Sequence, residues 1–105
     1  MTRFVTLQVG GEEYRLRLTA EAILAAEKKL DKSIITALQT IQENLLGTVT
    51  VILWAAMQPL QPGTTMERVY EIYDDYIDGG HTVEELLAVI TELFEVSGFF
   101  KRGQA

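Results

Sequence analysis

Cysteine is absent from this chain of 105 residues, and histidine occurs once. Without cysteine there can be no disulfide, no thiolate zinc site and no thiol nucleophile. Basic residues are also scarce, because nine lysines and arginines stand against fifteen aspartates and glutamates, for a net charge of −6. Phosphate binding needs clustered lysine and arginine, so this balance argues against nucleic acid as the main ligand. It favours a partner that is neutral or basic.

Long hydrophobic segments are lacking as well. The longest apolar run is VTVILWAAMQPL, residues 49–60, and it is interrupted by Thr50 and Gln58. A membrane-spanning helix needs about 20 apolar residues, so we interpret this run as a buried core helix. The N-terminal residues MTRFVTLQVGG contain no apolar stretch of signal-peptide length. We therefore expect a soluble intracellular protein with no membrane contact.

Motifs for catalysis, cofactors and metals are missing too. The single histidine, His81, lies between Gly80 and a helix-capping threonine, where we expect it to be exposed in a loop. The glycine pairs do not follow the phosphate-loop or dinucleotide patterns, and no calcium-loop sequence is present. No nucleophile motif accompanies the histidine. The sequence therefore predicts no catalytic, cofactor-binding or metal-binding residue, and a protein that is not an enzyme.

The first pattern that is present is an alternation of period two over residues 3–18. Val5, Leu7 and Val9 fall on one face of a first strand. Tyr14, Leu16 and Leu18 do the same in a second strand, and GGEE lies between them. Glycine pairs tolerate the positive φ of tight hairpin turns. The pattern predicts a β-hairpin, which must pack on helices or use its edge to extend another subunit's sheet.

The caps and apolar stripes of residues 19–98 predict a helical bundle. Thr19 is a suitable cap for a helix over 20–30. A further helix is predicted by one apolar stripe, formed by Ile34, Leu38, Ile41 and Leu45. We expect Gly47 to end that helix and Thr48 to cap the next one, which is apolar on nearly all sides and belongs at the centre of the fold. Pro59 and the Pro62-Gly63 pair should end this central helix.

Two capping boxes predict the last two helices. Thr64 with Glu67 would open a helix over 66–78, and Thr82 with Glu85 would open one over 83–97. Gly79-Gly80 and Gly98 suit the left-handed position after a helix. The short link predicts that the two helices form an antiparallel hairpin. The fold class predicted for residues 1–105 is a single α+β domain, mainly α: a hairpin, about four to five helices, and a flexible tail over 99–105.

The first of these two helices presents both charge and aromatic rings. Glu67, Glu71, Asp74 and Asp78 lie at helical spacing on one face. Such a face is either simply solvated or an electrostatic docking surface for a basic partner. The tyrosines 70, 73 and 76 fall on the apolar side, where we expect them to pack in the core or at its rim. The partner-binding candidates are Phe99, Phe100, Tyr73, Tyr76, Glu67, Glu71, Asp74 and Asp78.

Several segments together resemble a known family. The hairpin-to-helix start EEYRLRLTAEAI, the apolar LLGTVTVILWAAM and the C-terminal DDYIDGG and ELLAVITELFEVSGFF are similar to the tail assembly chaperones of long-tailed (siphovirus-type) phages and prophages. The resemblance covers nearly the whole chain and implies a non-enzymatic role in the host cytoplasm. Members of that family bind the tape-measure protein, and in some systems tail-tube subunits, and are absent from the finished virion. They tend to self-associate, and many exist in two lengths through a ribosomal frameshift.

Other functions stay open at this stage. A structural head–tail connector or tail terminator would share the phage context but would remain in the particle. A regulatory or toxin–antitoxin partner is compatible with the acidic charge. For the last residues, SGFFKRGQA, we consider three interpretations. Phe99 folds back on the helix that Gly98 ends, the two phenylalanines contact a client or a second copy, or their codons mark the frameshift site.

Overall fold

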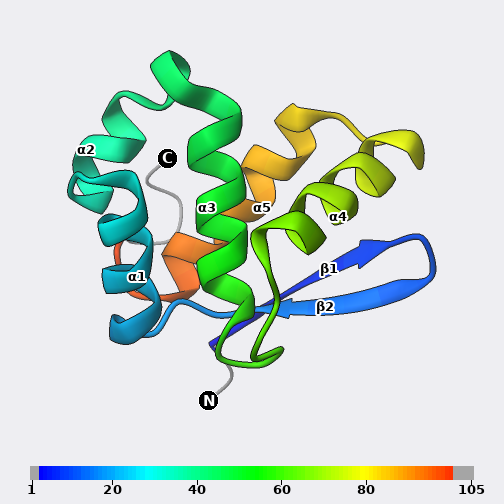
Figure 1. The fold of residues 1–105 in the computed structure, drawn as a ribbon, viewed down its shortest axis with the longest axis horizontal. Coiled ribbons are helices and arrows are strands. Elements are labelled where there is room, and N and C mark those ends of the chain that lie inside the picture. Colours follow the sequence, from blue (N-terminus) through cyan, green and yellow to red (C-terminus); the bar gives the residue numbers. More distant parts are fainter. Residues whose placement is uncertain (1–2, 101–105) are drawn as a thin grey trace.

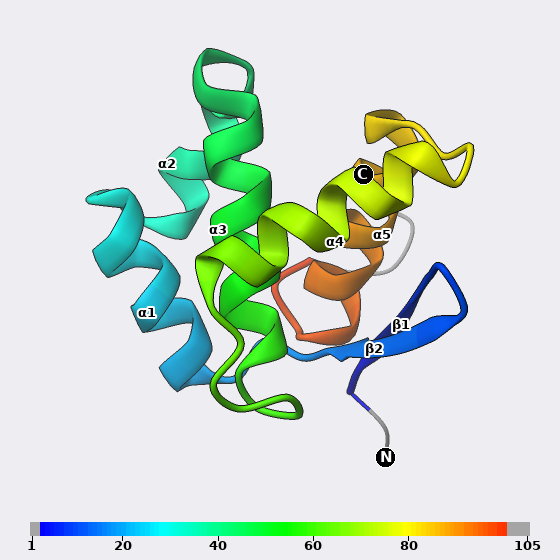
Figure 2. The same cartoon turned by 45° about the vertical axis from the view of Figure 1, so that its right-hand side comes forward.

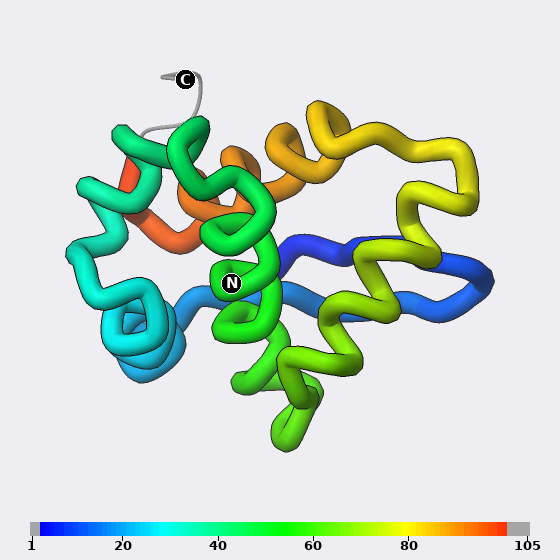
Figure 3. The backbone as a smooth tube through the Cα atoms, turned by 45° about the horizontal axis from the view of Figure 1, so that its top comes forward, coloured from blue at the N-terminus to red at the C-terminus, as the bar shows by residue number. Residues whose placement is uncertain are grey.

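The computed structural model describes residues 3–100, and it confirms the α+β, mainly helical prediction (Figure 1). The elements in chain order are β1 Val5–Val9, β2 Glu12–Leu16, α1 Ala20–Leu30, α2 Ile34–Gln39, the 3-10 turn η1 Ile41–Asn44, α3 Leu45–Met57, α4 Met66–Asp78 and α5 Val83–Val96. In Figure 1, α1 and α2 lie on one side of α3, and α4 lies with the hairpin on the other. The tube in Figure 3 shows that the end of α5 reaches the side of α2. None of the described helices is long and apolar enough to cross a membrane.

The predicted hairpin is confirmed. The strands β1 and β2 pair antiparallel, with Val5 opposite Leu16 and Val9 opposite Glu12. Gly10 and Gly11 form the two-residue turn, and their φ angles of 55° and 85° are both in the left-handed region that glycine tolerates. The alternation also holds, because all three apolar side chains of β1 are buried. This face packs against α4 and α5, which lie over the hairpin in Figure 2.

Helix α3 is the centre of the fold, as predicted, but its start is not where we expected it. Its buried residues include Val49, Ile52 and Leu53, each with 0% of its surface exposed. Gly47 and Thr48 lie inside the helix rather than before it. The side chain of Asn44 lies so close to Gly47 that an added Cβ would come within 2.5 Å of its Oδ1. The glycine therefore accommodates a neighbouring side chain and does not end a helix.

The segment before α3 is not the single helix that its apolar stripe predicted. The helix α2 stops at Gln39, where Thr40 turns its backbone N–H and its hydroxyl toward the carbonyl of Thr36, both at 2.9 Å. A 3-10 turn then leads into α3. Ser33, which we did not predict as a cap, accepts a hydrogen bond from the N–H of Thr36 at 3.2 Å. The apolar side chains still face the core, although the backbone changes direction between them.

The starts of α4 and α5 confirm one of the two predicted capping boxes. The hydroxyl of Thr82 accepts from the N–H of Glu85 at 3.2 Å, as expected. At α4 the cap is Thr65, which accepts from the N–H of Arg68 at 3.1 Å, so the box predicted from Thr64 is wrong. Thr64 instead donates to a loop carbonyl. In Figure 1, α5 runs back in roughly the opposite direction to α4, but both helices pack mainly on α3 and β1 rather than on each other.

Candidate partner-binding site

The end of α5 places the two terminal phenylalanines. Gly98 has a φ of 88°, and its N–H donates to the carbonyl of Glu95 at 3.1 Å. The N–H of Phe99 reaches back to the carbonyl of Phe94 at 3.0 Å, which completes a Schellman motif. The Phe99 ring packs edge-on against the Phe94 ring, with centroids 5.4 Å apart. This confirms that Gly98 ends the helix and that Phe99 folds back on it. Residues 101–105, the rest of the predicted tail, lie outside the described part.

Phe100 forms one wall of an apolar groove. Its ring is 6.1 Å from that of Phe94, and 37% of the residue is exposed. The groove has a volume of about 370 Å³ and runs between α2 with η1 on one side and α5 on the other. Its lining is apolar except for one hydroxyl and comprises Leu38, Ile41, Leu87, Ile90, Thr91, Phe94 and Phe100. We call it the Phe100 groove. Such a surface can bind apolar side chains by non-covalent contacts.

The candidates on α4 do not line the Phe100 groove. Tyr73 and Asp74 instead border a second hollow of about 320 Å³ between α4 and the start of α3. Leu46 and Tyr70 border the same hollow and are 51% and 50% exposed. The prediction that Tyr70 packs in the core or rim is therefore wrong. Ile72, only 1% exposed, takes the inward position on this helix. The predicted site thus divides into two separate surfaces.

Tyr76 lies in the core, as expected for a tyrosine on the apolar side of α4, and only 5% of its surface is open to a partner. Its ring stacks on His81, with centroids 4.3 Å apart, in the turn that ends α4. His81 is exposed, as predicted, and its Nδ1 lies 2.8 Å from Oε2 of Glu85. This hydrogen bond lowers the pKa of Glu85, and burial raises the pKa of Tyr76. His81 therefore links the last turn of α4, through Tyr76, to the first turn of α5, through Glu85.

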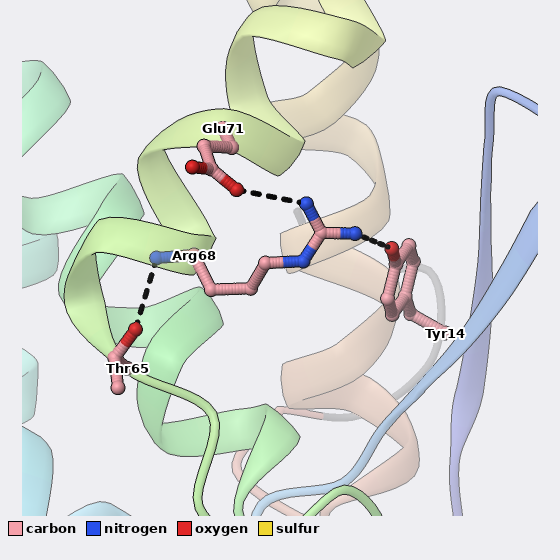
Figure 4. Close-up of polar contacts among 4 residues, drawn as sticks. All are labelled: Tyr14, Thr65, Arg68 and Glu71. Carbon is pink, nitrogen blue, oxygen red and sulfur yellow. Dashed lines mark hydrogen bonds and ion pairs between the residues drawn. The ribbon is translucent and has the colours of Figure 1, made fainter.

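The acidic face of α4 is exposed along its length but is not purely negative. The side chains concerned are Glu67, Glu71, Asp74 and Asp78. Nη1 of Arg68 lies 3.0 Å from Oε1 of Glu71, and Nη2 donates to the Tyr14 hydroxyl at 2.8 Å (Figure 4). The hydrogen bond to Glu71 is the main reason that the pKa of Arg68 is raised. One carboxylate of the face is therefore paired within the chain, and the arginine also ties α4 to the hairpin.

Residues 3–100 contain no cluster of metal-ligating side chains. Within that range, no three histidine, aspartate or glutamate side chains gather closely enough to hold a metal ion. The residues that sequence reasoning missed are the aliphatic walls of the Phe100 groove, namely Leu38, Ile41, Leu87 and Ile90. Their spacing indicated burial, and nothing in the local pattern distinguishes a groove wall from a core position.

Comparisons with known proteins give a family and no function. Searches of curated proteins and of solved structures returned no match. A family model described as a family of unknown function, DUF6096, matches residues 2–105. The match spans the hairpin, every helix and both surfaces described above. The chain therefore belongs to the DUF6096 family.

Proposed function

We propose that this protein is a tail assembly chaperone of a long-tailed phage or prophage, which binds an apolar helical segment of the tape-measure protein in the Phe100 groove. The observation that carries the proposal is the groove itself, which joins α2, η1 and α5 in one open apolar surface. An amphipathic helix presents apolar side chains at i, i+3, i+4 and i+7, and such a row fits a groove with apolar walls. The sequence resemblance supplies the identity of this client.

The chemistry of the groove suits reversible binding. Phe100 remains 37% exposed, so the free protein keeps apolar surface available at the groove. A client helix would cover that ring and the aliphatic walls, and would be released when the tube packages it. The exposed carboxylates of α4 would add long-range attraction for basic client segments, which raises the association rate more than the affinity. Tail-tube subunits are a second client class that the resemblance implies. The chaperone would act in the host cytoplasm, without enzymatic activity.

A binding measurement with the purified tape-measure product, or peptides that tile it, tests the proposal. We expect the Phe100→Ala variant to weaken binding at least about ten-fold, because an aromatic ring at the centre of an interface is a common hot spot. Phe100 is preferable to Phe99 for this test, since Phe99 also completes the helix stop. The matched control is Leu24→Ala, which removes an apolar side chain that is 64% exposed on α1. Equal affinity for both variants would contradict the assignment of the groove.

The virion distinguishes this function from the structural alternative. A chaperone leaves before the particle is complete, whereas a head–tail connector or a tail terminator remains in it. Mass spectrometry of purified particles should therefore find the tail tube and the tape measure without this chain. Stoichiometric amounts of the chain in the particle would refute the chaperone and favour the connector or terminator.

A further inference from the structure

The two edges of the hairpin differ, and the difference points to a second interaction surface. The outer edge of β2 is covered inside the chain. Oε1 of Gln61 accepts from the N–H of Arg15 at 2.7 Å, and Nε2 donates to the carbonyl of the same residue at 2.8 Å. The N–H of Arg17 then donates to the carbonyl of Ala56 at 2.9 Å. A side chain of the loop after α3 and a carbonyl of α3 itself therefore cover this edge.

The outer edge of β1 has no such cover. Pairs in an antiparallel ladder alternate between hydrogen-bonded and non-hydrogen-bonded, and the pair that flanks a two-residue turn is hydrogen-bonded. Val9–Glu12 is that pair, so Thr6 and Gln8 direct their main-chain N–H and C=O groups away from β2. Across residues 3–100, no backbone or side-chain group bonds to these main-chain groups. Both residues are exposed.

This edge also lacks the features that usually prevent strand pairing. Natural edge strands are protected by charge, proline or a bulge. The strand VTLQV has no charged residue and no proline, and its register with β2 is unbroken. Its apolar side chains are buried against the helices, so the strand is held in an extended form before any partner arrives. The partner of such an edge is another extended strand rather than the helix that fits the Phe100 groove.

We infer that β1 pairs antiparallel with β1 of a second copy of this chain, about a two-fold axis at Leu7. In this register Thr6 lies opposite Gln8 of the second copy, and both pairs related by the axis are hydrogen-bonded. The buried faces of the two strands match as well. Val5 lies opposite Val9 of the second copy and Leu7 lies opposite Leu7 of the second copy, all on the side of the sheet that the helices cover. Only uncharged side chains meet, so the net charge of −6 places no like charges opposite each other in the seam. Two hairpins become one sheet of four strands.

Disulfide trapping tests the register, because the natural chain contains no cysteine. The Cα atoms of a hydrogen-bonded antiparallel pair lie about 5.5 Å apart, within the range of a disulfide, whereas diagonal neighbours are about 7–8 Å apart. We expect a mixture of Thr6→Cys and Gln8→Cys to form a covalent dimer under mild oxidation by diamide, and each variant alone to form far less. The register would be overturned if either variant cross-linked efficiently on its own, or if the mixture formed no covalent dimer.

Sedimentation analysis tests the interface itself. The wild-type protein should sediment as a dimer of 11.8 kDa chains and dissociate on dilution. Thr6→Pro removes an outward N–H and should raise the dimer Kd at least about ten-fold. Leu24→Ala is the control, since it changes an exposed side chain on α1, outside the hairpin, and should leave the Kd unchanged. A wild-type protein that stays monomeric up to about 1 mM overturns the inference. Phe100→Ala should not alter the dimer, which separates this test from that of the groove.

Discussion

Gln61 should be among the most sensitive polar positions of this protein, although it lies in a loop. Its side-chain amide makes two hydrogen bonds to the main chain of Arg15 and a third, of 3.1 Å, to the carbonyl of Met57. One side chain therefore connects the end of α3 to the edge of β2. Replacing it by alanine leaves the N–H and C=O of Arg15 without their protein partner, in a position that water reaches in part.

The expected cost of Gln61→Ala follows from these bonds. A hydrogen bond between neutral groups contributes about 0.5–1.5 kcal/mol net, so losing the pair at Arg15 should lower the free energy of unfolding by about 1–3 kcal/mol. In a domain of this size each kcal/mol lowers the melting temperature by about 4–8 °C. Gln61→Glu should cost at least as much, because it keeps one acceptor, loses both donors and places a carboxylate beside two carbonyl oxygens.

Urea unfolding followed by far-UV circular dichroism measures both variants. Gln39→Ala, at the exposed end of α2, is the control and should stay within about 0.5 kcal/mol of the wild type. If Gln61→Ala also stays within that range, the amide does not stabilise the sheet edge, and the assignment of β2 as a covered edge fails.

Three further predictions concern the helix ends and the core. Gly98→Ala should cost about 1–2 kcal/mol in urea unfolding, because φ is 88° there, and Gly98→Asn should cost less since asparagine tolerates this region better. Because the hydrogen bond from His81 lowers the pKa of Glu85, this carboxylate adds stability above its unfolded-state pKa of about 4.3, and that stability is lost as the pH falls through the folded-state value. Glu85→Gln should therefore have a lower urea midpoint than the wild type at neutral pH and should converge with it in acid; parallel curves would contradict this. Leu53→Ala, at a site with 0% exposure, should cost about 2–5 kcal/mol by the same unfolding measurement.

The elements that sequence reasoning predicted well are those with a local physical cause. The hairpin follows from alternation around Gly10-Gly11, and α5 follows from Thr82 at its start and Gly98 at its end. The prediction of where α3 starts failed for a reason that is not local. Gly47 looked like a stop, yet its missing side chain leaves room for Asn44 against the helix. No spacing rule distinguishes a glycine that ends a helix from one that accommodates a neighbour.

The candidate site was predicted only in part, because it depends on tertiary contacts. Phe100 and the fold-back of Phe99 could be inferred from the chain end. The opposite wall of the groove comes from Leu38 and Ile41, about 60 residues earlier, and becomes a wall only when α5 passes α2. The acidic face was identified correctly as exposed. Its distance from the groove follows from α4 packing on α3 and β1, which the pattern along one helix does not show.

The cover that Gln61 gives to β2 has a consequence for the size of any assembly built through the hairpin. A sheet that can accept strands at both edges propagates into an open fibre, whereas one that accepts them at a single edge stops growing as soon as that edge is used. Because the main chain of Arg15 is already occupied, the pairing of two β1 strands leaves a covered β2 at each outer boundary. In the proposed dimer, Gln61 and the Arg17–Ala56 hydrogen bond therefore limit the sheet to two chains, and loss of Gln61 would uncover part of the outer edges.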